Sequence, residues 1–160
     1  MLNPTDKLIR RWILKQANHL GVVYLGFFLP LMEQKKLLKK FGKKHPNIHT
    51  DHMTIWFFQD GGDPQLEKLP LGKSFPLKII GYVEDDKAQV ALVQLPSKFK
   101  LRSGRIAHIT LTAASGVPPK YSKELIAHSS RKDIQKGLPT VTGKLGWFDG
   151  EKVRYDQPNT

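Results

Sequence analysis

Apolar residues recur along parts of this chain at the spacing of an α-helix. They lie three and four residues apart between Thr5 and Gly21, and again between Pro30 and Gly42, where lysines occupy the intervening positions. This spacing predicts two amphipathic helices, the first capped by Thr5 and ended by Gly21, and the second rich in lysine. A third, short helix is expected over residues 121–129.

Other apolar segments are short and rich in β-branched and aromatic residues, which is typical of strands. The strands expected from this pattern cover residues 22–29, 52–59, 75–83, 88–95 and 106–113. The acidic turn at 84–87 predicts a hairpin, and a turn at Asp149-Gly150 predicts a closing hairpin over 143–155. The mixture of helices and hairpins favours an α+β fold with a largely antiparallel sheet, in one domain over 1–160.

Composition narrows the class of protein. Hydrophobic residues make up 39% and charged residues 25% of the chain, which is the balance of a soluble globular protein. The longest apolar stretch, residues 21–32, is interrupted by Pro30 and is shorter than the roughly 20 residues that span a bilayer. Because the N-terminus also lacks a signal-peptide pattern, we expect no membrane association. The absence of cysteine excludes disulfides and thiolate sites and fits a reducing compartment, so we expect a cytoplasmic protein.

The net charge is strongly positive. It is +12, from 26 Lys and Arg against 14 Asp and Glu, and it favours a polyanionic partner, with nucleic acid as the leading candidate. Part of the excess lies in two clusters, namely Lys35, Lys36, Lys39, Lys40, Lys43 and Lys44, and then Lys98, Lys100, Arg102 and Arg105. Either cluster can be an ordinary solvated surface, but the second leads directly into a motif described next and suggests attraction of an anionic substrate.

Two tripeptides, His52-Met53-Thr54 and His108-Ile109-Thr110, carry most of the functional information. Each places an imidazole and a hydroxyl two residues apart, and in an extended strand these side chains share one face. Apolar, β-prone residues follow each tripeptide, so both are expected on strands. Two such strands side by side would bring both histidines to one phosphate. A purely structural role for two histidine-bearing strands is the alternative.

A second group of histidines suggests a metal site. His45, His49 and His52 lie close in sequence beside Asp51, and clusters of histidine and carboxylate can bind zinc. Pro46, however, interrupts any helix that would align these side chains. We therefore expect no metal and no other cofactor.

The chain resembles the two-histidine phosphoesterase superfamily, and within it the 2′,3′-cyclic nucleotide 3′-phosphodiesterases (CNPases). The similar segments follow the same order along nearly the whole length. Residues 24–29 are similar to that family's first strand, 52–57 and 105–114 to its two motif strands, and Gly143-Lys144-Leu145 to the start of its closing hairpin. The resemblance implies a two-lobed fold, with antiparallel strands and a flanking helix in each lobe around a central cleft that holds both motifs.

The resemblance also implies which residues contact the substrate. Mammalian-type sequences of the family have an arginine two positions before the second histidine, where this chain has Ile106, with Arg105 one residue further away. Arg105, Tyr24, Phe57 and the loop Val117-Pro118-Pro119 are the implied substrate-binding residues, and Phe57 is the aromatic wall for the base. Core packing is the alternative for the two aromatic residues. Animal CNPases carry a kinase-like domain and a prenylated tail, and we expect neither here.

The implied reaction is hydrolysis of 2′,3′-cyclic phosphates of nucleotides or RNA ends to 2′-phosphates. Because histidine titrates near about pH 6.5, one neutral and one protonated ring can act as general base and general acid. We assign His108 as the base and His52 as the acid, an order that the symmetry of the motifs leaves open. The hydroxyls of Thr54 and Thr110 would hold the non-bridging phosphate oxygens without a metal.

Two other functions fit the same residues. An enzyme of the same superfamily can act on 2′-5′ linked or cyclic oligonucleotides, and a non-catalytic module can use the basic surface to bind RNA. The expected partner is a nucleotide or RNA with a 2′,3′-cyclic phosphate, and the protein itself is expected to be a monomer. Turnover of a cyclic phosphate would separate the enzymes from the binding module.

Overall fold

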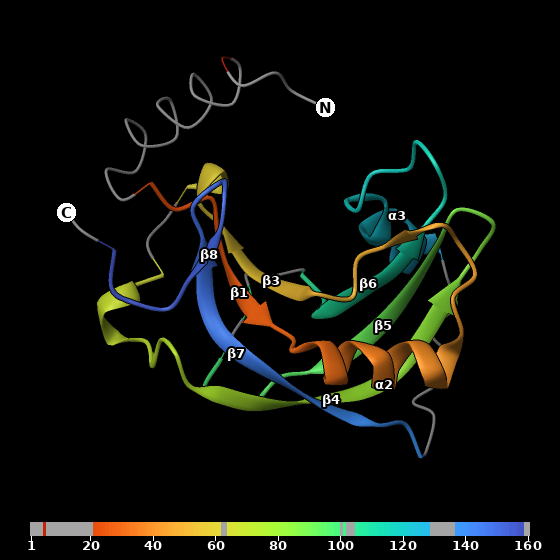
Figure 1. Ribbon diagram of the computed structural model, residues 1–160, viewed down its shortest axis with the longest axis horizontal. Coiled ribbons are helices and arrows are strands. Elements are labelled where there is room, and N and C mark those ends of the chain that lie inside the picture. Colours follow the sequence, from red (N-terminus) through yellow and green to blue (C-terminus); the bar gives the residue numbers. More distant parts are fainter. Residues whose placement is uncertain are drawn as a thin grey trace.

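The computed structural model of the protein describes residues 5, 21–61, 64–99, 101, 105–128 and 137–158 (Figure 1). Helix α2 spans Leu31–Phe41 and α3 spans Tyr121–His128, and short 3₁₀ turns lie at Phe58–Asp60 and Leu66–Lys68. The strands are β1 Tyr24–Phe28, β2 Asn47–Ile48, β3 His52–Phe57, β4 Ser74–Glu84, β5 Ala88–Gln94, β6 His108–Ala113, β7 Thr140–Phe148 and β8 Val153–Arg154. Apart from its two end residues, Thr5 and Gly21, the helix expected over 5–21 lies outside the described residues.

The strands form one eight-stranded sheet in the order β2-β6-β5-β4-β7-β1-β3, with β8 paired to β7 beside this path. Every pair in it is antiparallel. The sheet bends so strongly that β3, at one end of the order, lies beside β6, near the other end (Figure 1), with Cα atoms of the two strands within 8 Å. At Gly26 of β1 an added Cβ would lie 2.5 Å from the carbonyl oxygen of Met53, so only glycine permits β3 to pair this closely.

Two apolar clusters cover opposite faces of β5. Leu37 of α2 is fully buried in the main core, together with Val93 of β5. Leu125 of α3 packs instead against Val90 and Leu92 of the same strand. Since alternate residues of a strand face opposite sides, α2 and α3 lie on the two faces of the sheet at β5. Helix α3 thereby lies on the face that also carries the candidate site.

The predicted α+β class and antiparallel sheet are confirmed. Helix α2 ends where the sequence predicts, with the backbone N–H of Gly42 donating to the carbonyl of Leu38 at 2.7 Å. The hairpin predicted around the acidic turn is the pair β4 and β5. The short helix predicted over 121–129 is α3.

Several strand boundaries differ from the predicted ones. The strand predicted over 52–59 ends at Phe57, because the chain then enters a 3₁₀ turn in which the N–H of Gly61 donates to the carbonyl of Phe58 at 3.1 Å. The last hairpin begins at Thr140 instead of at residue 143, because β7 must also reach β4. In the part of the chain that the structure describes, no helix is long and apolar enough to cross a membrane.

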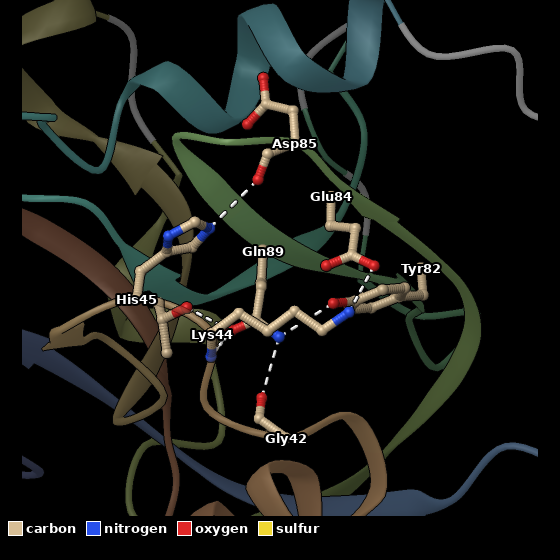
Figure 2. Close-up of polar contacts among 8 residues, drawn as sticks. Gly42, Lys44, His45, Tyr82, Glu84, Asp85 and Gln89 are labelled. Carbon is tan, nitrogen blue, oxygen red and sulfur yellow. Dashed lines mark hydrogen bonds and ion pairs between the residues drawn. The ribbon is translucent and has the colours of Figure 1, made fainter.

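A buried polar network joins the loop after α2 to β5 and β6 (Figure 2). The fully buried amide nitrogen of Gln89 donates to the carbonyl of Gly42 at 2.8 Å and to the Tyr82 hydroxyl at 2.9 Å. Its amide oxygen accepts from the backbone N–H of Lys44 at 3.0 Å and from the Thr112 hydroxyl. Both ends of the buried amide thus have partners, and they hold β6 in register with the loop.

Further polar contacts tie α3 to the turn between β4 and β5. The carboxylate of Asp85 accepts a hydrogen bond from the hydroxyl of Tyr121, the first residue of α3. His45 Nε2 lies 3.1 Å from the carbonyl oxygen of Asp85 and donates to it, and Lys44 Nζ pairs with Glu84 at 2.6 Å (Figure 2). The helix that borders the candidate site is therefore anchored at its first turn.

Replacing Gln89 by leucine should lower the free energy of unfolding by about 2–4 kcal/mol, because several buried polar groups lose their partner at once. Gln94→Leu, at the exposed end of the same strand, should change it by less than about 0.5 kcal/mol. Urea unfolding followed by tryptophan fluorescence measures both values. Equal effects of the two substitutions would contradict a structural role for the network.

Candidate active site

The alternation of β3 and β6 turns both His-x-Thr motifs away from the main core. The central residues of the motifs, Met53 and Ile109, are 1% and 0% exposed and pack in that core. Neighbouring residues of a strand face opposite sides, so the histidine and threonine of each motif lie on the other face. The pleat therefore fixes the orientation that the sequence predicted for each pair.

Both motifs line one pocket of about 350 Å³. This volume falls within the range of cavities that hold small molecules, about 300–1,000 Å³. The lining comprises His52, Thr54, His108 and Thr110 from the motifs, the apolar and aromatic residues Ile55, Trp56, Phe57, Leu101, Ile106, Pro119, Ile126 and Ala127, and the basic residues Arg105, Lys120 and Lys123. The bend of the sheet thus brings histidines from distant segments to one cavity.

A carboxylate and an aromatic ring orient His52. Its Nδ1 lies 2.9 Å from Asp51 Oδ1, and its ring stacks on Tyr24 with centroids 5.2 Å apart. The hydrogen bond from His52 lowers the pKa of Asp51, so this carboxylate is ionised near neutral pH and accepts from Nδ1–H. The remaining nitrogen, Nε2, is then the one available for proton transfer.

A backbone carbonyl orients His108. Its Nδ1 lies 2.8 Å from the carbonyl oxygen of Ile106, which can only accept a hydrogen bond, so Nδ1 carries the proton. Burial lowers the pKa of His108, and the positive charges of Lys123 and Arg105 lower it further, against the opposing effect of the carbonyl. Near neutral pH the ring is accordingly neutral, with a lone pair on Nε2 that can accept a proton.

The hydroxyl of Thr110 is held by the helix beside it. Its Oγ1 lies 2.7 Å from Oγ of Ser122, a residue of α3 that is 1% exposed. When Ser122 donates this hydrogen bond, the Thr110 proton is left to point into the pocket, where it can reach an anionic oxygen. Ser122 is therefore the residue that positions this hydroxyl.

The described lining is positively charged. It contains Arg105, Lys120 and Lys123, and none of the described lining residues is acidic. Cations around a partly enclosed, largely apolar cavity attract an anionic ligand more strongly than they do in bulk water. The electrostatics of the pocket therefore favour an anionic ligand.

The structure places some of the other implied substrate-binding residues at the pocket and others away from its lining. Phe57 and Pro119 line the pocket. Tyr24 is outside the lining and stacks behind His52, where burial raises the pKa of its phenol. Val117 and Pro118 are also outside the lining, so the loop contributes only its last proline.

Of the two described residues of the second basic cluster, Arg105 lines the pocket and Lys98 does not. Lys98 lies over the Phe75 ring, with Nζ 4.4 Å from the ring centroid, at the edge of the main core. Lys100 and Arg102 lie outside the described residues. The lysines of the first cluster are absent from the described lining. Four of them lie on α2, which covers the opposite face of the sheet, and Lys44, beyond the helix, pairs with Glu84.

Sequence reasoning missed the contribution of α3 and of Lys120, the residue before it. Lys120, Lys123 and Ala127 line the pocket and follow one another at the three- and four-residue spacing of a helix face. This spacing is visible in the sequence, but nothing local shows that the helix packs beside the second motif. Trp56 and Leu101 were likewise not expected at the pocket.

The three histidines that suggested zinc do not all come together, although His49 is close enough to Asp51 and His52 to feel the charge of both. His45 donates to the carbonyl of Asp85, whereas His52 faces the pocket. Among the described residues, no group of three or more histidine or carboxylate side chains is placed to hold a metal ion.

Comparison with known proteins gives no family. The chain matches no protein-family model, and no curated protein matches it significantly. Its function is accordingly inferred from the chemistry of the site.

Both pocket histidines should carry their proton on Nδ1 when neutral, and His108 should titrate below about pH 6.5. Because the folded chain then binds this proton less readily than the unfolded chain, the contribution of His108 to stability falls as the pH drops below about 6.5. Long-range proton–nitrogen correlation spectra recorded across this pH range report the tautomers and the titration. A proton on Nε2 of either neutral ring, or a His108 midpoint at or above the ordinary value, would contradict the described site.

Proposed function

We propose that the protein hydrolyses 2′,3′-cyclic phosphates to 2′-phosphates. The observation that carries the proposal is the convergence of two imidazoles and two threonine hydroxyls on one basic pocket. The resemblance to two-histidine phosphoesterases supports the same reaction. Each group needed for in-line hydrolysis of a phosphodiester has a counterpart in the lining.

The two histidines differ in a way that supports distinct roles. His108 Nε2 accepts a proton from water, whose oxygen then attacks phosphorus, and the P–O3′ bond breaks as His52 Nε2 donates a proton to O3′. The neutral state of His108 suits a general base. His52, the proposed acid, donates from Nε2, because its Nδ1–H is held by the Asp51 carboxylate at 2.9 Å.

The threonines and cations stabilise the charge that develops on phosphorus. Thr54 and Thr110 donate hydrogen bonds to the non-bridging oxygens, and Arg105 lies near enough to His108 to lower its pKa. These groups supply proton transfer and charge stabilisation from the chain itself. We therefore propose that the reaction needs no metal.

We also propose the two-lobed arrangement implied by the family resemblance. The bent sheet supports it, since β3 with β1 and β7 forms one arm and β6 with β5 forms the other. Each arm carries one motif. A base stacked on Phe57, beside the first motif, completes the proposed binding of a nucleotide.

Replacing either histidine by alanine should lower turnover of adenosine 2′,3′-cyclic phosphate by about 10²- to 10⁴-fold, or about 3–5 kcal/mol of barrier. Phosphorus NMR follows the substrate and identifies the product as a 2′-phosphate. His128→Ala, exposed at the end of α3, serves as the control and should turn over normally. Parent-like rates for His52→Ala and His108→Ala would contradict the proposal, and salt-sensitive RNA binding without any product would favour the binding module.

Activity should survive prolonged dialysis against EDTA, because the proposed proton transfers and charge stabilisation all come from side chains. The rate constant before and after dialysis is the measurement. Loss of activity that added zinc restores would contradict a metal-independent reaction and would revive the metal interpretation of the histidines.

A further inference from the structure

The pocket holds more positive charge than a single cyclic phosphate requires. A 2′,3′-cyclic phosphate is a diester with one negative charge, and the Thr hydroxyls, Arg105 and both histidines already surround it in the proposed reaction. Lys120 and Lys123, both on the α3 side of the pocket, add two more cations. Lys120 directly precedes α3 and Lys123 lies in its first turn. They are three residues apart, so their side chains lie on the same side of this turn.

Lys123 lies between the second motif and the aromatic wall. Its Nζ is 6.0 Å from the centroid of the Phe57 ring, and its charge lowers the pKa of His108. A base stacked on Phe57 at the usual contact distance of about 3.5 Å would occupy the space beneath this ammonium group. A bound nucleotide would therefore displace the Lys123 head group from the ring while leaving it at the pocket.

The chemistry of a cyclic nucleotide restricts where a second anion can lie. The cyclic phosphate uses both O2′ and O3′, so any further phosphate on the same ribose must be attached through O5′. Such a group lies on the opposite side of the sugar from the reacting phosphorus and near the base. With the reacting phosphorus between the histidines and the base on Phe57, the O5′ side of the nucleotide would face Lys123, whose Nζ is 6.0 Å from the Phe57 ring centroid.

We propose that Lys120 and Lys123 bind a second phosphate of the substrate, attached to O5′ of the nucleoside that carries the cyclic phosphate. This inference rests on the proposed function and specifies its substrate class. The second phosphate is either a terminal 5′-phosphate or the phosphodiester that links a preceding nucleotide. Both present anionic oxygens to the same lysine ammonium groups.

Three substrates distinguish these sources: adenosine 2′,3′-cyclic phosphate, its 5′-phosphorylated form, and the dinucleotide ApA with a 2′,3′-cyclic phosphate end. At least one of the two that carry a second phosphate should have a kcat/KM about tenfold above that of the simple cyclic nucleotide. Preference for the 5′-phosphorylated mononucleotide alone identifies a terminal phosphate. Preference for the dinucleotide, whether or not the 5′-phosphorylated mononucleotide is also preferred, identifies a site that accepts an RNA end.

Variants test whether the lysines cause the preference. Lys123→Gln and Lys120→Gln should each reduce the ratio between two-phosphate and one-phosphate substrates severalfold, and Lys123→Arg should restore most of it. Lys39→Gln removes the same charge from the surface of α2, outside the described pocket lining, and should leave the ratio unchanged. For the dinucleotide, Lys123→Gln should also reduce the slope of log kcat/KM against log salt by about 0.7.

The outcomes separate this proposal from the proposed function. Equal kcat/KM values for all three substrates, or a preference that both glutamine variants retain, would overturn the second phosphate site while leaving the cyclic phosphodiesterase intact. No hydrolysis of any of the three would overturn the proposed function itself, and with it this site.

Discussion

Two buried apolar side chains control the direction of both candidate catalytic rings. Met53 on β3 and Ile109 on β6 are anchored in the main core, and the pleat of each strand turns the flanking residues of its motif to the opposite face. A shift of either strand by one residue would bury the imidazole and expose the anchor. The apolar centre of each tripeptide is thus as necessary to the site as the polar residues beside it.

The bend of the sheet supplies the second requirement, which is that the two motifs meet. β3 and β6 lie at and near opposite ends of the strand order, and only the strong curvature of the sheet brings them within 8 Å. The glycine at position 26, which lies against the Met53 carbonyl, permits β3 to pair closely with β1. The pocket therefore depends on contacts made throughout the sheet.

Near-identical motifs acquire different properties from their surroundings. Each histidine uses Nδ1 for a local acceptor, but the acceptor is the Asp51 carboxylate for His52 and the neutral Ile106 carbonyl for His108. Lys123 and Arg105 add positive charge near His108 and, with burial, favour its neutral form. The two motifs are alike in sequence, but the fold gives their histidines different surroundings. This difference fits the proposal that one histidine acts as the base and the other as the acid.

Local patterns of the sequence were sufficient to predict the strand face of each motif, the hairpin of β4 and β5, and the end of α2 at Gly42. They could not predict that β7, late in the chain, pairs between β4 and β1, because such pairing joins distant segments. For the same reason the sequence did not predict that Lys120 and Lys123 line the pocket, because their position there depends on how α3 packs on β5. Val117 and Pro118 were expected at the substrate, and the lining includes only the adjacent Pro119.

The central claim is that both imidazoles face one phosphate, and titration with adenosine 2′-phosphate, the product of the proposed reaction, tests it most directly. The ring resonances of His52 and His108 are followed by NMR as the ligand is added. The account predicts that both sets of resonances move along one saturation curve and give the same Kd. A response from only one ring, or two different dissociation constants, would show that the histidines do not share a ligand and would contradict the account.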